Sequence, residues 1–124
     1  MTDKKRADRP EHLSVQRKLV DGVLVVTVRG EIDHDVKDVL SQALLPEDGT
    51  PPPRVVADLS GVSFMDSSGI NVFVAAHQQV SGAGGWLRIA GATDSVSRLL
   101  HMVGIDALIP CHPTVEQALH PWNP

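Results

Sequence analysis

The sequence Asp66-Ser67-Ser68-Gly69 places a carboxylate and two hydroxyl groups next to one another. A short apolar run precedes these residues and a helical pattern follows, so we expect them where a loop enters a helix. Asp66 is a favourable N-cap and would leave Ser67 in the first exposed turn, beside unpaired backbone amides. Those amides and the helix dipole favour an anion, so a phosphate on Ser67, or as second choice on Ser68, would be tolerated.

The same four residues have a plainer interpretation, because Asp-Ser-Ser-Gly is also good capping chemistry at a sharp loop. Short motifs of this kind often occur without a function. Spacing alone therefore leaves two hypotheses open: a phosphorylation site and a simple helix cap.

A second polar group follows the second predicted strand and contains Glu31, Asp33, His34, Asp35 and Asp38. Sites in open α/β sheets cluster outside the carboxyl ends of strands, so we expect this group near Asp66. The carboxylates either complement the dipole at a helix start or form an acidic rim that meets a basic partner surface. Both interpretations remain open.

Catalytic and metal-binding interpretations find little support. A serine hydrolase would need a base and an orienting acid beside Ser67 or Ser68. His34 and His77 are present, but the Gly-x-Ser-x-Gly elbow is absent. The other histidines considered lack a metal-ligand spacing: His101, His112 and His120. The single cysteine, Cys111, is expected to act as a small hydrophobe, and we expect no catalytic residue, metal or cofactor.

The composition of the 124 residues indicates one domain with an aliphatic core, because only two Trp and two Phe are aromatic and Tyr is absent. That leaves no stacking platform for single-stranded nucleic acid. Net charge is −4, and residues 1–12 contain Lys4, Lys5, Arg6 and Arg9, so the remaining chain is the more acidic part. No basic face for DNA or anionic membranes is therefore expected. No signal peptide or membrane-spanning run is recognisable. We therefore expect a protein of the reducing cytoplasm that binds neither nucleic acid nor membranes.

Several strands are predicted to position these groups. Leu13, Val15, Arg17 and Leu19 alternate with polar residues, which is typical of a half-buried strand. Asp21-Gly22 predicts a tight hairpin into the apolar run Val23–Arg29, which should be buried on both faces. Further short strands are predicted at Val55–Leu59, Trp86–Ala90 and Ala107–Ile109.

Helical patterns separate these strands. The first stripe consists of Val36, Val39, Leu40, Ala43 and Leu44. The second runs from Ile70 to Val80, before Gly82, Gly84 and Gly85. The third opens at Thr93 or Asp94, buries Val96, Leu99, Leu100 and Val103, and ends at Gly104. A capping box from Thr114 to Gln117 opens a short fourth helix.

This alternation predicts an α/β fold: a single domain with a mostly parallel mixed sheet, an N-terminal antiparallel hairpin and about four covering helices. We expect the domain to span residues 13–120. Residues 1–12 are interpreted as a disordered tail and residues 121–124 as a C-terminal tail.

These residues resemble the signature of bacterial anti-sigma factor antagonists of the STAS-domain type. The resemblance rests on Asp58–Met65 followed by Asp66-Ser67-Ser68-Gly69, and on Gly30–His34 at the end of the second strand. Gly84-Gly85 and Arg98–Ile105 match the family's later pattern. The match covers about Leu13 to Leu119 and implies a STAS-like fold. Asn71 departs from the pattern, where the family commonly has a glycine, which concerns partner docking and leaves the phosphorylation site intact.

The resemblance implies a binding partner and not a reaction. Family members bind an anti-sigma factor that is also a serine kinase, and thereby free a sigma factor. The kinase phosphorylates the serine after the motif aspartate, here Ser67, and a serine phosphatase restores it. The implied partner-binding residues are Glu31, Asp33, His34, Asp66, Ser67, Ser68, Gly69 and Asn71. The alternative is a STAS scaffold subunit of a stress-signalling or transporter complex without regulated phosphorylation, and an enzyme ranks third.

Overall fold

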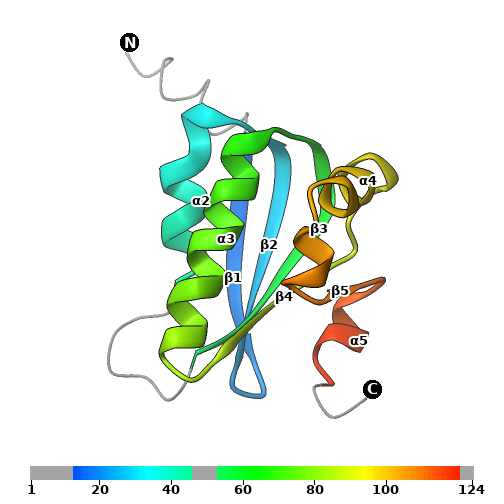
Figure 1. Ribbon diagram of the computed structural model, residues 1–124. Coiled ribbons are helices and arrows are strands. Elements are labelled where there is room, and N and C mark those ends of the chain that lie inside the picture. Colours follow the sequence, from blue (N-terminus) through cyan, green and yellow to red (C-terminus); the bar gives the residue numbers. More distant parts are fainter. Residues whose placement is uncertain (1–12, 46–52, 121–124) are drawn as a thin grey trace.

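The computed structural model describes residues 13–45 and 53–120. A five-stranded mixed sheet carries the fold (Figure 1), with β1 (Leu13–Val20), β2 (Val23–Ile32), β3 (Arg54–Met65), β4 (Trp86–Ala90) and β5 (Cys111–His112). The helices are α2 (Lys37–Ala43), α3 (Ser67–Gly82), α4 (Asp94–Met102) and α5 (Val115–Ala118), with 3-10 turns η1 (His34–Val36) and η2 (Ile105–Ala107). The two predicted tails lie outside the described residues. None of the described helices is long and apolar enough to cross a membrane.

The sheet order is β1-β2-β3-β4-β5, so each strand pairs with its neighbours in the sequence. The β1–β2 pair is antiparallel and the remaining pairs are parallel, which confirms the predicted class. The hairpin turn has positive φ at both central residues, 51° at Asp21 and 82° at Gly22. Those angles belong to the tight turn that Asp-Gly favours, because its twist matches that of the strands.

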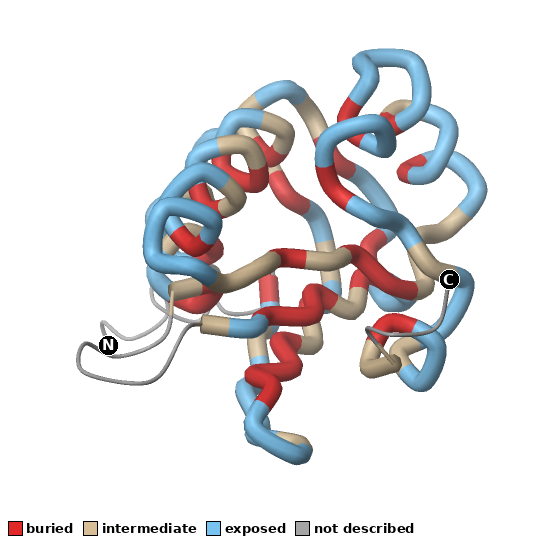
Figure 2. The backbone as a smooth tube through the Cα atoms, turned by 60° about the horizontal axis from the view of Figure 1, so that its bottom comes forward, coloured by how far each residue is buried: buried red, intermediate tan, exposed pale blue. Residues whose placement is uncertain are grey.

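The helices that connect parallel strands lie on one face of the sheet. Right-handed crossovers between strands added in one direction place successive helices on the same side. Apolar residues of α2, α3 and α4 accordingly share one core with alternate residues of β2 and β3, including Leu24, Val26, Val55 and Ala57. Figure 2 shows buried residues along the sheet and on the inner sides of the helices, with exposed residues outside.

The opposite face has a smaller apolar cluster, which α5 covers. Val23, Val25 and Val56 point to this side, so β2 is buried on both faces as predicted. Arg88 attaches α5 to the sheet, because its Nη1 donates to the Ala118 carbonyl at 2.9 Å. Its guanidinium also stacks 3.8 Å from the centre of the Trp86 ring.

The strand predicted at Val55–Leu59 is longer in the structure and reaches Met65. Residues 60–65, predicted as a loop, pair with the end of β2. The register shifts twice along this pair, so β3 contains extra, bulged residues there. The sequence of this segment resembles a turn because it contains Ser60, Gly61 and Ser63. Val62 and Met65 nevertheless stabilise the pairing of β3 with β2, because both are buried in the core.

Three further predictions were wrong. Ala107–Ile109 is not a strand: residues 105–107 form η2, and the last strand is Cys111–His112. Val39 is 55% exposed and Val103 is 51% exposed, although both were expected inside their helical stripes. Helix α2 has only seven residues, so its buried stripe is narrower than a full amphipathic face.

Candidate functional site

Strands β2 and β3 end side by side and bring the two predicted polar groups together. Ile32 pairs with Met65 at the carboxyl ends of the two parallel strands. The Asp66 N–H donates to the Ile32 carbonyl at 3.1 Å, so the chain after β3 is fixed against the chain after β2. Asp33 and Asp66 therefore follow directly after two adjacent strand ends, as expected (Figure 1).

Each of these aspartates caps the helical turn that follows it. The Asp66 carboxylate accepts a hydrogen bond from the Ser68 N–H at 2.8 Å and caps α3. The Asp33 carboxylate accepts one from the Asp35 N–H at 3.1 Å and caps η1. Both caps have extended backbone angles, which is the usual geometry of an N-cap. The predicted capping role of Asp66 is confirmed.

Ser67 is the first residue of α3 and is exposed. Ser68, the second choice for phosphorylation, is partly buried, and its amide is held by Asp66. Asn71 is exposed and lies four residues after Ser67, so both side chains share one face of the helix. The structure thus presents the Ser67 hydroxyl more openly than that of Ser68.

Glu31 and His34 complete the edge on the β2 side. Both residues are exposed, Glu31 in the last part of β2 and His34 as the first residue of η1. Glu31 pairs with Phe64 of β3. His77, the other histidine considered as a base, lies ten residues after Ser67 on the same helix, about 15 Å along its axis. That separation argues against a Ser67–His77 catalytic pair.

Gly69 is buried at the start of α3. It lies within α3, and its φ is not among the positive values of the described glycines. A Cβ at this position would lie 2.6 Å from Met65 Cγ and 2.7 Å from Ile32 Cγ2. Glycine is therefore required because the helix start packs directly on the ends of β2 and β3.

Of the amides at the start of α3 that were expected to be unpaired, only the Ser67 N–H has no acceptor among the described residues. The Ser68 N–H donates to the Asp66 carboxylate, and the Gly69 N–H donates to the Asp66 carbonyl at 3.0 Å. The Ile70 N–H also donates to that carbonyl, at 3.4 Å. The Asp66 carboxylate thus uses the Ser68 N–H, a donor that a nearby anion would otherwise meet, whereas the bonds to its carbonyl are those of the first helical turn.

Phe64 is a surface residue that the sequence analysis missed. Its side chain is 48% exposed two residues before Asp66, among mostly aliphatic core residues that are fully buried. An exposed aromatic residue next to a polar edge is typical of a protein-binding surface. The sequence held a signal, because Phe64 is one of only two phenylalanines, but its exposure depends on the unexpected extension of β3.

Comparison with known proteins identifies the fold family. The family model for the STAS domain matches residues 14–118. The chain belongs to the STAS domain family. A relative in Paenibacillus polymyxa, an anti-sigma F factor antagonist, is 29% identical over 112 residues, covering 87% of this chain and 93% of that protein.

Solved structures agree with this assignment. The structure of an anti-sigma factor antagonist from Mycobacterium paratuberculosis superposes with a TM-score of 0.79 at 31% identity, over 90% of this chain and 95% of that one. The STAS domain of a SulP transporter from Vibrio cholerae gives a TM-score of 0.66 at 25% identity, over 84% and 83% of the two chains. STAS domains of this shape thus occur both in regulators and in transporters.

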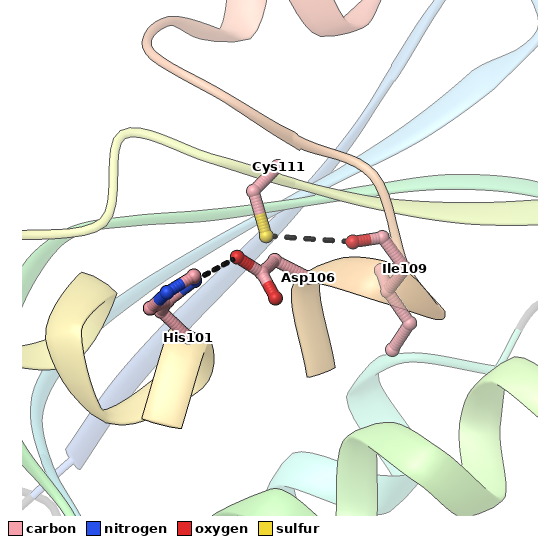
Figure 3. Close-up of polar contacts among 4 residues, drawn as sticks. All are labelled: His101, Asp106, Ile109 and Cys111. Atoms are coloured by element: carbon pink, nitrogen blue, oxygen red, sulfur yellow. Dashed lines mark hydrogen bonds and ion pairs between the residues drawn. The ribbon is translucent and has the colours of Figure 1, made fainter. Parts of the chain in front are cut away.

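Away from this edge, the STAS domain holds a compact polar cluster at the end of α4 (Figure 3). The His101 Nδ1 lies 2.8 Å from an Asp106 carboxylate oxygen, and the Cys111 Sγ donates to the Ile109 carbonyl at 3.4 Å. Among residues 13–45 and 53–120, no three histidine, cysteine, aspartate or glutamate side chains are grouped so as to hold a metal ion.

Cys111 is exposed as a residue, but partial desolvation of its thiol, together with the charge of Asp106, raises the pKa of that thiol to about 11 from an ordinary 9.0. We predict that Cys111 reacts with iodoacetamide at pH 8 roughly a hundredfold more slowly in the native protein than in denaturant, because the thiolate fraction falls tenfold per pKa unit. Because the folded protein holds the thiol proton more tightly than the unfolded chain, this thiol costs no stability below pH 9, and the free energy of unfolding falls as pH rises from 9 towards 11. Equal alkylation rates in both states would contradict the shift; mass spectrometry measures them.

Proposed function

We propose that this STAS domain is an anti-sigma factor antagonist of the bacterial cytoplasm. Its unphosphorylated form binds an anti-sigma factor with serine kinase activity and so releases a sigma factor. Phosphorylation at Ser67 ends that binding, and a serine phosphatase restores it. Support comes from the Paenibacillus polymyxa and Mycobacterium paratuberculosis relatives, both described as anti-sigma factor antagonists. These are regulatory binding proteins, which supports a binding role without catalysis for this chain.

One observation carries the proposal: Ser67 is exposed at the first position of α3, directly after a capping aspartate. A kinase must reach the hydroxyl and align it with a phosphoryl donor, and a helix start holds the backbone that carries this hydroxyl in a defined position. Because Asp66 is tied to both Ile32 and Ser68, the acceptor position is fixed by the two strand ends.

The proposed partner-binding surface is the edge where β2 and β3 end. It consists of Glu31, Asp33, His34, Asp66, Ser67, Ser68, Gly69 and Asn71. Gly69 contributes from beneath the surface, because it is buried and allows α3 to approach the strands. The acidic residues favour a kinase with a basic rim around its active site, since opposite charges steer association.

The alternative is a scaffold role without phosphorylation, which the likeness to a transporter STAS domain favours. The two hypotheses differ in what happens to Ser67. An antagonist accepts a phosphate there and loses its partner, whereas a scaffold keeps its partners whatever occupies that position.

We predict that a cognate anti-sigma kinase with ATP adds one phosphate, on Ser67 and not on Ser68, because Ser67 is the more exposed hydroxyl. Phosphopeptide mass spectrometry locates the group. Ser67→Ala should abolish incorporation and Ser68→Ala should retain it, which makes the two variants a matched pair. Candidate kinases are found by pull-down with the wild-type protein and Ser67→Ala, followed by identification of the bound proteins. Phosphate on Ser68, or incorporation into Ser67→Ala, contradicts the assignment.

A further inference from the structure

The start of α3 is a capped helix N-terminus in which the side chain of Asp66 holds the Ser68 amide, while no described residue offers an acceptor to the Ser67 N–H. Asp66 accepts the Ser68 N–H through its carboxylate at 2.8 Å and the Gly69 and Ile70 N–H groups through its carbonyl. An open helix start would offer such amides to a phosphate. In this protein the shortest of these hydrogen bonds, from the Ser68 N–H, already has the Asp66 carboxylate as its acceptor.

The neighbouring sequence supplies no fixed cation to replace those amides. The two capped turns, residues 31–36 and 66–72, contain no lysine or arginine. The nearest lysine in sequence, Lys37, lies 3.7 Å from Asp38, with which it forms an ion pair. A phosphate on Ser67 would also be the immediate chain neighbour of the Asp66 carboxylate, so the two anions repel each other.

We propose that the Asp66 carboxylate, by keeping the Ser68 N–H, denies that amide to the phosphate on Ser67 and leaves the phosphate facing solvent and an incoming partner. The inference rests on the proposed phosphorylation of Ser67 and describes how its signal is generated. Asp66 has two roles in this proposal. Before phosphorylation it orders the turn that carries Ser67, and afterwards it prevents the Ser68 amide from binding the phosphate.

The Asp66 carboxylate is also expected to raise the second pKa of a phosphate on Ser67. A phosphoserine loses its second proton near pH 6 in an ordinary environment, and a neighbouring carboxylate makes that loss harder. Asp66→Asn keeps a capping side chain of nearly equal quality while removing its charge. Glu31, Asp33, Asp35 and His34, which also line this edge, are the same in both proteins, so the difference reports on Asp66.

The experiment uses the full chain with phosphoserine incorporated at position 67 by an expanded genetic code, so it needs no kinase. Phosphorus NMR titrations follow the phosphate in this protein, in Asp66→Asn and in Asp94→Asn, which removes a carboxylate from the first turn of α4. We expect Asp66→Asn to lower the second phosphate pKa by about half a unit or more, the effect of a unit charge roughly 6 Å away in water. Asp94→Asn should leave it unchanged.

A second readout follows the hydrogen bond itself. In nitrogen–proton spectra the Ser68 amide of the wild-type protein should keep its position on phosphorylation, whereas in Asp66→Ala it should move downfield as the phosphate takes it. An unchanged phosphate pKa in Asp66→Asn, or a wild-type Ser68 amide that moves downfield with phosphate ionisation, overturns the inference. Neither result depends on a kinase. The proposed function fails separately if a phosphorylated protein retains full affinity for its kinase in calorimetry.

Discussion

Phosphorylation of Ser67 is expected to weaken binding of the anti-sigma kinase about a thousandfold while the fold stays the same. The phosphate adds about −1.5 to −2 charges at neutral pH. A docked partner would strip water from that charge next to the Asp66 carboxylate. A poorly paired buried charge costs on the order of 4 kcal/mol, which corresponds to the thousandfold loss. In the free protein Ser67 is exposed, so the same charge remains hydrated.

Calorimetric titration of the kinase with the unmodified and the phosphoserine-67 proteins measures the change in affinity. Circular dichroism of both forms checks the fold. Phosphoserine at Ser95 is a matched control, because Ser95 is also exposed in the first turn of a helix and follows an aspartate. Its affinity should stay near that of the unmodified protein. Equal affinity of the phosphoserine-67 form would refute the switch, and a collapsed circular dichroism spectrum would refute its local electrostatic origin.

The Ser67→Asp variant should reproduce only part of the loss of affinity, because aspartate carries less charge than phosphoserine.

Gly69→Val is expected to lower the free energy of unfolding by about 3 kcal/mol, the upper range for overpacking a core. The Cβ alone would lie within 2.7 Å of side-chain carbons of Met65 and Ile32, and valine adds two methyl groups. Met65 is flexible and could move, but Ile32 is β-branched and fully buried at the end of β2. The helix start must therefore shift away from the strands.

Urea denaturation of the two proteins measures this difference. Gly82→Val is the control, because Gly82 ends the same helix and a Cβ there has no atom within 4 Å. It should change stability by only a few tenths of a kcal/mol, since valine and glycine differ little in helix propensity. If Gly69→Val unfolds like the control, the close contact between α3 and the strand ends is not as described. Kinase binding should fall together with stability, because the shifted turn carries Ser67.

Features that depend on neighbouring residues were predictable from the sequence. Asp66 as a cap needs only its own carboxylate and an amide two residues later, and Asp21-Gly22 forms its turn within four residues. The meeting of the Asp33 and Asp66 turns followed from a rule of topology, because parallel strands end at one edge of the sheet. The fold class and the centre of the site rest on such short-range or general rules.

The features that were missed depend on contacts between distant segments. Residues 60–65 form a strand only because β2 provides a partner for them, and the bulges that fit them to it leave no simple alternation. The role of Gly69 requires knowing that Ile32, 37 positions earlier, lies against it. The occupied amides of α3 required the hydrogen bonds themselves, since a cap residue can satisfy one donor or several.

The consecutive order of the five strands affects how the chain can fold during synthesis. Each strand after β1 finds its pairing partner already synthesised when it emerges from the ribosome, so the sheet can grow in one direction without waiting for later segments. The parts that define the acceptor turn, β2, β3 and α3, are complete once Gly82 has been synthesised. We therefore expect a nascent chain stalled well beyond Gly82, but before α4 leaves the ribosomal tunnel, to protect the Ser68 amide from hydrogen exchange. The order of synthesis and the order of assembly then coincide at the proposed phosphorylation site.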